Sequence, residues 1–132
     1  IFDGSSDEAT EKLFDDILAK KEFFGQLSHI LEKGELDETR VILYFEGYIY
    51  EMLLFLLYSK AYGEVDSIKI TGRKLPDFVV RQKASKAVKL NIKHYAKILD
   101  ILSKADLKLK SSNVGDKNAI LINALMKIQS NL

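Results

Sequence analysis

The longest apolar stretch of the chain, VILYFEGYIYEMLLFLLY at residues 41–58, places the strongest constraint on how the protein folds. Only Glu46 and Glu51 bring charge into it. A helix that is apolar on almost every side has to be surrounded by other elements. The uninterrupted apolar run at residues 52–58 is far shorter than the roughly 20 residues of a membrane span. We therefore predict a central core helix over about residues 37–62.

Apolar residues at helical spacing continue on both sides of this segment. Residues 1–34 are typical of two paired short helices, residues 36–62 of the central helix, and residues 76–132 of three further helices. The main break is at residues 63–76, where SIKI could add a short extended piece but nothing supports a sheet. We predict a single all-α domain over residues 1–132, a compact bundle of about six helices.

Capping residues mark where these helices should begin and end. Short polar side chains can accept hydrogen bonds from the free backbone N–H groups of a first helical turn. Gly34 is expected to terminate the second helix, because glycine readily adopts the left-handed conformation that follows many helices. The expected N-caps are Ser5 or Ser6, Asp77, Asn91 and Asp116.

Charge is divided unevenly along the chain. Residues 1–66 hold 6 Lys or Arg against 15 Asp or Glu, a net charge of −9, and residues 67–132 hold 14 against 4, a net charge of +10. Such polarity could steer a charged partner or a nucleic acid. We favour the simpler interpretation that the two halves attract each other and keep the outer surface solvated.

The sequence offers little for catalysis. It has no cysteine, which excludes disulfides, thiolate metal sites and a cysteine nucleophile. Its two histidines, His29 and His94, lack the spacing of helical di-iron or zinc sites, and no glycine-rich phosphate loop is present. Asp15 and Asp16 are expected on the exposed side of their helix. We therefore expect no catalytic, cofactor-binding or metal-binding residue, and no enzyme activity in these residues.

A basic run passes through residues 83–97, with lysines at intervals of three or four. We predict Lys86, Lys89 and Lys93 as residues that could contact DNA or a protein partner, which gives a helical nucleic-acid-binding module as the alternative function. A helix boundary near Asn91 is expected to interrupt the run, and no aromatic platform accompanies it. A solvated outer face is the simpler interpretation.

Asp106 lies on an apolar stripe together with Leu99, Leu102 and Leu109. A carboxylate on a buried face is unfavourable unless it is paired or hydrogen-bonded. Lys110 follows four residues later, in the favourable order for a helical ion pair. Because no catalytic partner is evident, we predict a structural role for Asp106, with hydrogen bonds from a neighbouring helix if it is buried.

The segment at residues 74–128, KLPDFVVRQKASKAVKLNIKHYAKILDILSKADLKLKSSNVGDKNAILINALMKI, resembles the C-terminal region of the delta subunit of bacterial DNA polymerase III. The stretch LFDDILAKKEFFGQLSHILEKGE at residues 13–35 is similar to the paired short helices of the same family. The matching elements of the first segment are Pro76–Phe78, Asp106 with Leu109 and Lys110, and Leu121–Leu125.

This resemblance implies a helical collar domain of a clamp loader, without an ATP site of its own. Its implied partners are the gamma or tau and delta-prime subunits of a pentameric ring. The sliding clamp would be contacted by an N-terminal domain outside this sequence, and DNA through the assembled complex. The resemblance implies a cytoplasmic protein with no membrane contact, and the start at Ile1 is expected for a fragment of a longer chain.

Overall fold

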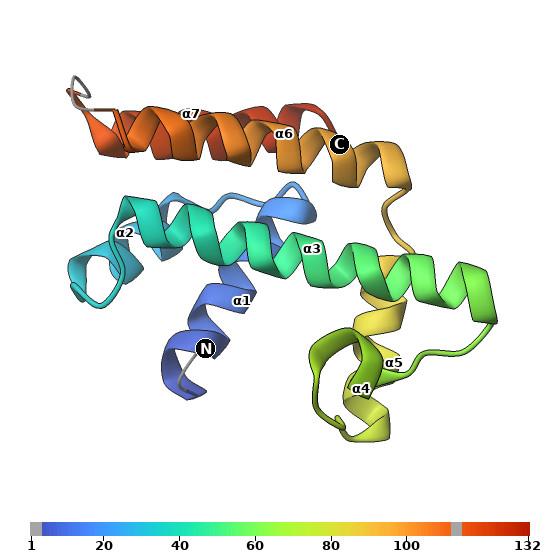
Figure 1. The fold of residues 1–132 in the computed structure, drawn as a ribbon. Coiled ribbons are helices and arrows are strands. Elements are labelled where there is room, and N and C mark those ends of the chain that lie inside the picture. Colours follow the sequence, from blue (N-terminus) through green and yellow to red (C-terminus); the bar gives the residue numbers. More distant parts are fainter. Residues whose placement is uncertain (1–3, 112–114) are drawn as a thin grey trace.

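The computed structural model describes residues 4–111 and 115–132, with the backbone alone for residues 4–7. Over these ranges the protein is all-helical, as predicted, and its helices pack into one bundle (Figure 1). The expected caps at Ser5 or Ser6 involve side chains outside the described residues. The elements are α1 (Gly4–Leu18), α2 (Phe24–Glu32), α3 (Glu38–Tyr62), α4 (Ser67–Thr71), α5 (Asp77–Ala87), α6 (Ile92–Leu109) and α7 (Lys117–Ser130).

The central helix is α3, which contacts α4, α5, α6 and α7. The Asp37 side chain accepts a 2.9 Å hydrogen bond from the backbone N–H of Arg40 and so fixes its start. Gly63 ends it in the left-handed conformation, at φ +77°, where its N–H donates to the Ser59 carbonyl. The prediction of a long central helix at residues 37–62 is confirmed to within a residue at its start.

By length and composition alone, α3 is also long and apolar enough to cross a membrane, and 44% of its most apolar stretch is buried inside the domain. The buried side includes Phe45, Ile49 and Phe55, none of which exposes any surface. Phe45 stacks on Phe14 of α1 with ring centroids 4.3 Å apart. The apolar residues of α3 therefore form two groups, one that packs in the core and one that faces outward.

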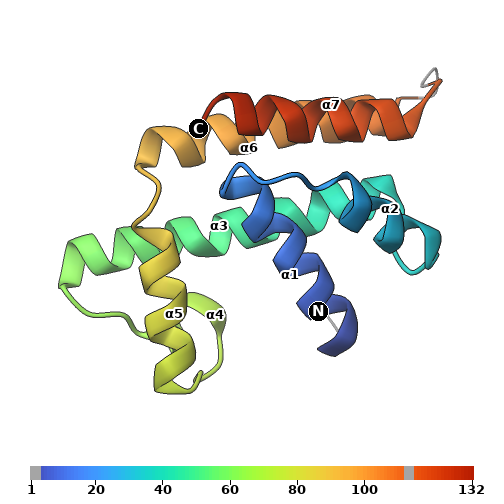
Figure 2. The ribbon, with the colours of Figure 1, turned by 180° about the vertical axis from the view of Figure 1, so that it is seen from behind.

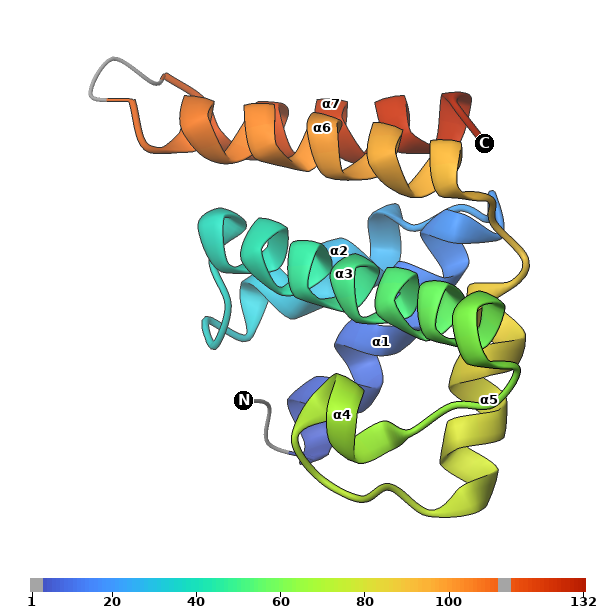
Figure 3. The same ribbon diagram turned by 45° about the vertical axis from the view of Figure 1, so that its right-hand side comes forward.

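The helices α6 and α7 form an antiparallel pair that lies along one side of α3 (Figure 3). Asn91 caps α6 in a capping box, in which its side chain accepts from the His94 N–H and the His94 ring accepts from the Asn91 N–H. Asp116 caps α7 by accepting a 3.1 Å hydrogen bond from the Ala119 N–H. Both predicted caps are confirmed.

The predicted extended piece at SIKI is wrong, because these residues form α4, a helix beyond the expected six. The Asp66 carboxylate accepts hydrogen bonds from the N–H groups of Ile68 and Lys69, and Gly72 ends the turn at φ +83°. This capping outweighs the preference of β-branched residues for extended backbone. The Thr71 hydroxyl also donates to the Ser67 carbonyl, 2.7 Å away.

Two other predicted helix ends differ in their outcome. Pro76, not Asp77, occupies the N-cap position of α5, and Asp77 is the first helical residue. Proline has its φ preset and lacks an N–H, so it suits a helix start without any side-chain cap. Gly34 follows the end of α2 at φ +76°, as predicted.

Candidate interaction surfaces

The predicted basic stripe does not reach solvent as one surface. Lys83 lies 3.5 Å from Glu51 of α3, and Lys86 lies 2.9 Å from Asp15 of α1. Lys89 and Lys93 are exposed, but they lie on either side of the break between α5 and α6. The first part of the stripe therefore makes ion pairs within the domain, and only the second part is free to meet a partner.

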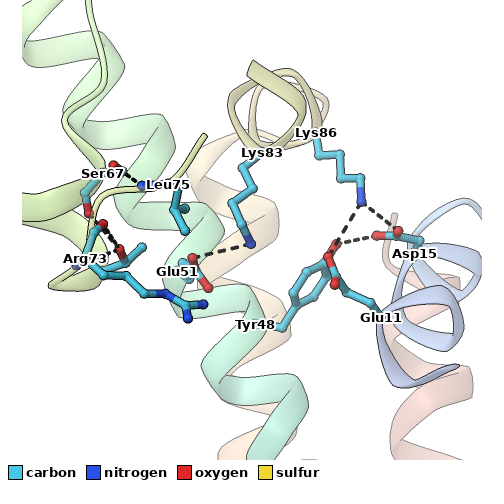
Figure 4. Close-up of polar contacts among 10 residues, drawn as sticks. Glu11, Asp15, Tyr48, Glu51, Ser67, Arg73, Leu75, Lys83 and Lys86 are labelled. Atoms are coloured by element: carbon cyan, nitrogen blue, oxygen red, sulfur yellow. Dashed lines mark hydrogen bonds and ion pairs between the residues drawn. The ribbon is translucent and has the colours of Figure 1, made fainter. Parts of the chain in front are cut away.

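These ion pairs belong to a polar junction where α1, α3 and α5 meet (Figure 4). The Tyr48 hydroxyl and the Lys86 ammonium both donate to the Asp15 carboxylate, and Lys86 also lies 3.9 Å from Glu11. We call Asp15, Tyr48 and Lys86 the α1–α3–α5 junction. It joins the acidic first half of the chain to the basic second half, the attraction expected from their opposite charges.

The prediction that Asp15 and Asp16 lie on an exposed side of their helix is wrong. Asp16 is 8% exposed and accepts hydrogen bonds from Gln26, at 2.5 Å, and Lys12, at 3.1 Å. The bond from Gln26 and then the bond and charge of Lys12 lower the pKa of the Asp16 carboxyl. Both carboxylates thus hold α1 against other parts of the chain.

Two tyrosines have their hydroxyls buried in the core. Burial, together with the bond to Asp15, raises the pKa of Tyr48 far above its ordinary value of 10. Burial raises the pKa of Tyr95 to about 12, and its hydroxyl donates to the Ala87 carbonyl, 2.6 Å away. Both hydroxyls therefore stay protonated at neutral pH and act as hydrogen-bond donors.

Asp106 of α6 has 16% of its side chain exposed and faces the charge of Glu46 on α3. Its Oδ2 accepts a 2.9 Å hydrogen bond from Lys110, whereas its Oδ1 is buried without a hydrogen-bond partner. Glu46 of α3 likewise has a buried Oε1 without a partner. Burial raises the pKa of Glu46 and the charge of Asp106 raises it further, while Lys110 opposes this. No hydrogen bond from a neighbouring helix reaches Asp106 within the described residues.

The other residues singled out in the sequence have plain structural positions. Leu109 is 3% exposed in the core, and Pro76 starts α5 on the surface. His29 is exposed and His94 completes the cap of α6. No group of three or more metal-ligating side chains occurs within the residues that the structure describes.

The outward side of α3 carries a continuous apolar stripe. In Figure 1 α3 passes in front of its neighbours, and in Figure 2, seen from behind, α1 and α5 cross it on the other side. Tyr50 exposes 56% of its surface, Leu43 45% and Leu57 41%. Successive members are four and three residues apart, and we call them the α3 outer face: Leu43, Gly47, Tyr50, Leu54, Leu57 and Ala61.

The sequence alone does not delimit this surface, because the segment at residues 41–58 is apolar on almost every side. The spacing was nevertheless visible, since the residues that recur at intervals of four and three are as apolar as those that fill the core. Two helix faces of equal hydropathy cannot be told apart until the neighbouring helices are placed.

Comparison with known protein families gives a match over most of the chain. Residues 12–128 fit a protein-family model described as HP_1247_C, C-terminal domain. No curated protein and no solved structure matches the chain.

This match contradicts the resemblance to the delta collar of DNA polymerase III. The family that fits is not described as a clamp-loader collar, and the comparisons give no support for clamp-loader function. The elements that suggested it, such as Leu109 and Leu121–Leu125, are leucines and small residues on amphipathic helices. Such residues recur in helical bundles of many kinds, because every bundle needs an apolar stripe.

Proposed function

The chain belongs to the HP_1247_C, C-terminal domain family, and we propose that this domain acts by binding a helix of a partner protein along the α3 outer face. The observation that carries the proposal is the continuous apolar stripe left open on the longest helix. Single exposed apolar residues are ordinary, whereas a contiguous exposed patch marks an interaction site.

The spacing of the stripe fits a helical partner. Intervals of four and three residues are those of the seam through which two helices pack side by side. Gly47 lies in the N-terminal part of the stripe, and a Cβ added there would meet nothing within 4 Å. The backbone of α3 is therefore open to close approach, flanked by the larger side chains of Leu43 and Tyr50.

The charges beside the stripe favour a protein over a lipid surface. Helices that lie on membranes carry Lys and Arg along the edges of their apolar face. The α3 outer face is bordered by Glu46 on the side of α6 and by Glu51 on the side of α5, and exposed Arg40 and Lys60 lie near its two ends. The edges of the stripe therefore carry both signs of charge and lack the rows of basic residues that hold a helix on anionic lipid.

A binding role also agrees with how the polar residues are used. Tyr48, Asp15 and Lys86 bond one another, and His94 serves a helix cap. These side chains stabilise the bundle and do not converge on a cavity. We therefore propose a non-catalytic module.

Photo-crosslinking at the stripe tests the proposal. We would introduce Tyr50→benzoylphenylalanine, express the protein in its host, irradiate, and identify crosslinked proteins by mass spectrometry. The matched control is Phe78→benzoylphenylalanine on α5, because Phe78 is an aromatic of similar exposure, 58% against 56%. We expect a protein adduct at position 50 that is absent at position 78, with the crosslinked peptide of the partner predicted to be helical.

Purified components then give the deciding measurement. Tyr50→Glu should abolish binding of the identified partner, whereas Phe78→Glu should leave its Kd unchanged. Equal crosslinking at the two positions would contradict the proposal. So would adducts consisting only of this chain, or flotation with lipid vesicles that Tyr50→Glu abolishes, because these would assign the face to a second copy or to a membrane.

A further inference from the structure

We propose that the domain has a second docking site, a groove between α6 and α7 that binds an acidic amphipathic helix. The groove encloses a cavity of about 290 Å³ between the two antiparallel helices. It is formed by different helices from the α3 outer face, and the argument for it is independent of the proposed function. We call it the α6–α7 groove, rimmed by Lys97, Lys104 and Lys108 of α6 and by Lys127 of α7.

The rim has a positive charge that the domain itself leaves largely uncompensated. Asp100 is the one acid that lines the groove, and it pairs with Lys104 at 3.0 Å. Lys97, Lys108 and Lys127 make no ion pair with any of the described residues. Four lysines against one aspartate give the lining a net charge of +3. This contrasts with Lys83 and Lys86, whose charges are used inside the bundle.

The floor of the groove is apolar. Ile101, Ala105 and Ala124 line it and are 7%, 4% and 5% exposed, and Leu107 stands at the edge with 68% of its surface exposed. The small alanines keep the floor shallow enough for another helix to approach. A ligand that fits therefore needs apolar side chains toward the floor and negative charge toward the rim.

The spacing of the rim lysines selects among acidic ligands. Lys97, Lys104 and Lys108 are seven and four residues apart, which places them about 10 Å and 6 Å apart along the axis of α6. Carboxylates at the same intervals on a ligand helix would lie at matching distances. Its leucines, between them, would face the floor. A nucleic-acid backbone could meet the lysines but would leave the apolar floor and Leu107 unused.

Peptide binding measured by fluorescence anisotropy tests the site. The probe is a labelled peptide held helical by a hydrocarbon staple, with glutamates seven and four residues apart and leucines on the adjoining stripe. We expect Lys97→Ala/Lys108→Ala to weaken its Kd about fivefold, the scale for two exposed ion pairs. The control, Lys89→Ala/Lys93→Ala, removes the same charge outside the groove and should change the Kd less than about twofold.

The apolar part of the site has its own control. Leu107→Ser should weaken binding of the peptide. Val88→Ser should leave binding unchanged, because Val88 is 60% exposed but lies outside the groove. Equal weakening by both lysine pairs would overturn the proposal, because it would show attraction to overall charge. Absence of binding would also overturn it. So would tighter binding of a single-stranded oligonucleotide that depends on Lys97 and Lys108, since the groove would then be a nucleic-acid site.

Discussion

Replacing Tyr48 by phenylalanine should destabilise the domain by about 1.5 kcal/mol, because it removes a buried hydroxyl that donates to a carboxylate. Tyr48 is 8% exposed and its hydroxyl bonds to Asp15. A hydrogen bond to a charged group contributes about 1.5–3 kcal/mol to stability. We expect a value at the lower end of this range, because the side chain of Asp15 is 34% exposed and water can replace the lost hydroxyl as a hydrogen-bond donor. The ring contact with Phe14 is retained in the variant.

Urea denaturation followed by far-UV circular dichroism measures this change, with linear extrapolation to water. A double-mutant cycle then identifies the bonding partner. In an Asp15→Asn background, Tyr48→Phe should cost about 1 kcal/mol less, because the accepting group no longer carries charge. Asp16→Asn is the matched control, since Asp16 bonds to Gln26 and Lys12 and not to Tyr48.

Two results would refute this reasoning about the α1–α3–α5 junction. One is a Tyr48→Phe variant within about 0.3 kcal/mol of the wild type, below the range of a single hydrogen bond. The other is a coupling energy with Asp16 as large as that with Asp15. Either would mean that the hydroxyl contributes nothing specific and that α1 is held mainly by apolar packing around Phe14.

Two further predictions concern the tyrosines and the glycines. Stability should fall as pH rises above about 10, because Tyr48 and Tyr95 lose their protons at that pH in the unfolded chain but keep them in the folded one, where the pKa of Tyr95 is about 12. The Tyr95→Phe variant should therefore show a smaller fall in melting temperature between pH 10 and 12. A fall as large as that of the wild type would contradict this. Gly63→Ala should lower the free energy of unfolding by about 1 kcal/mol, because Gly63 has a φ of +77° that alanine adopts only with strain. Gly47→Ala should raise it by up to about 1 kcal/mol, because Gly47 lies inside α3 with open space around it and alanine favours a helix. Equal urea midpoints for the two variants would contradict both expectations.

The parts of the fold that depend on neighbouring residues were readable from the sequence. Asn91 and Asp116 precede runs with helical periodicity, and a short polar side chain at that place has one dominant use. The prediction failed at α4, where Asp66 was a cap of the same kind but the two isoleucines beside it argued for extended backbone. When a capping residue favours a helix and its neighbours favour extended backbone, the difference in free energy is small and the sequence pattern does not show which one prevails.

The parts that depend on distant residues were not readable. Lys86 and Asp15 are 71 residues apart, and nothing near either residue indicates that they meet. The charge asymmetry of the two halves predicted attraction in general, but not that Asp15 would be drawn into the bundle. The same limit applied to α3, whose covered and open faces became distinct only when α5 and α6 were in place.

The resemblance to a clamp-loader collar failed for a related reason. Its matching positions were leucines, a proline before a helix and an acid followed by Leu109 and Lys110. Each has a sufficient local explanation, since Pro76 starts a helix and Asp106 pairs with Lys110 at 2.9 Å. Residues that any helical bundle requires cannot distinguish one family of bundles from another.

The acid on the buried stripe, Asp106, gives a prediction with a definite sign. Its neighbour Glu46 has a pKa raised above the ordinary value of 4.5, by burial first and by Asp106 second. The unfolded chain therefore loses the Glu46 proton at lower pH than the folded one does. Stability must fall as pH rises from about 4.5 through the raised folded value, so at neutral pH the ionised Glu46 opposes folding.

Glu46→Gln should therefore raise the melting temperature at neutral pH and leave it nearly unchanged at pH below 4.5, where Glu46 is already protonated. The neutral amide removes both the cost of burying a charge at this position and the repulsion from Asp106. The control is Glu51→Gln, which weakens a 3.5 Å pair with Lys83 and should be neutral or slightly destabilising. A Glu46→Gln protein less stable than the wild type at neutral pH would show that Glu46 is held by favourable contacts, and that Asp106 does not repel it.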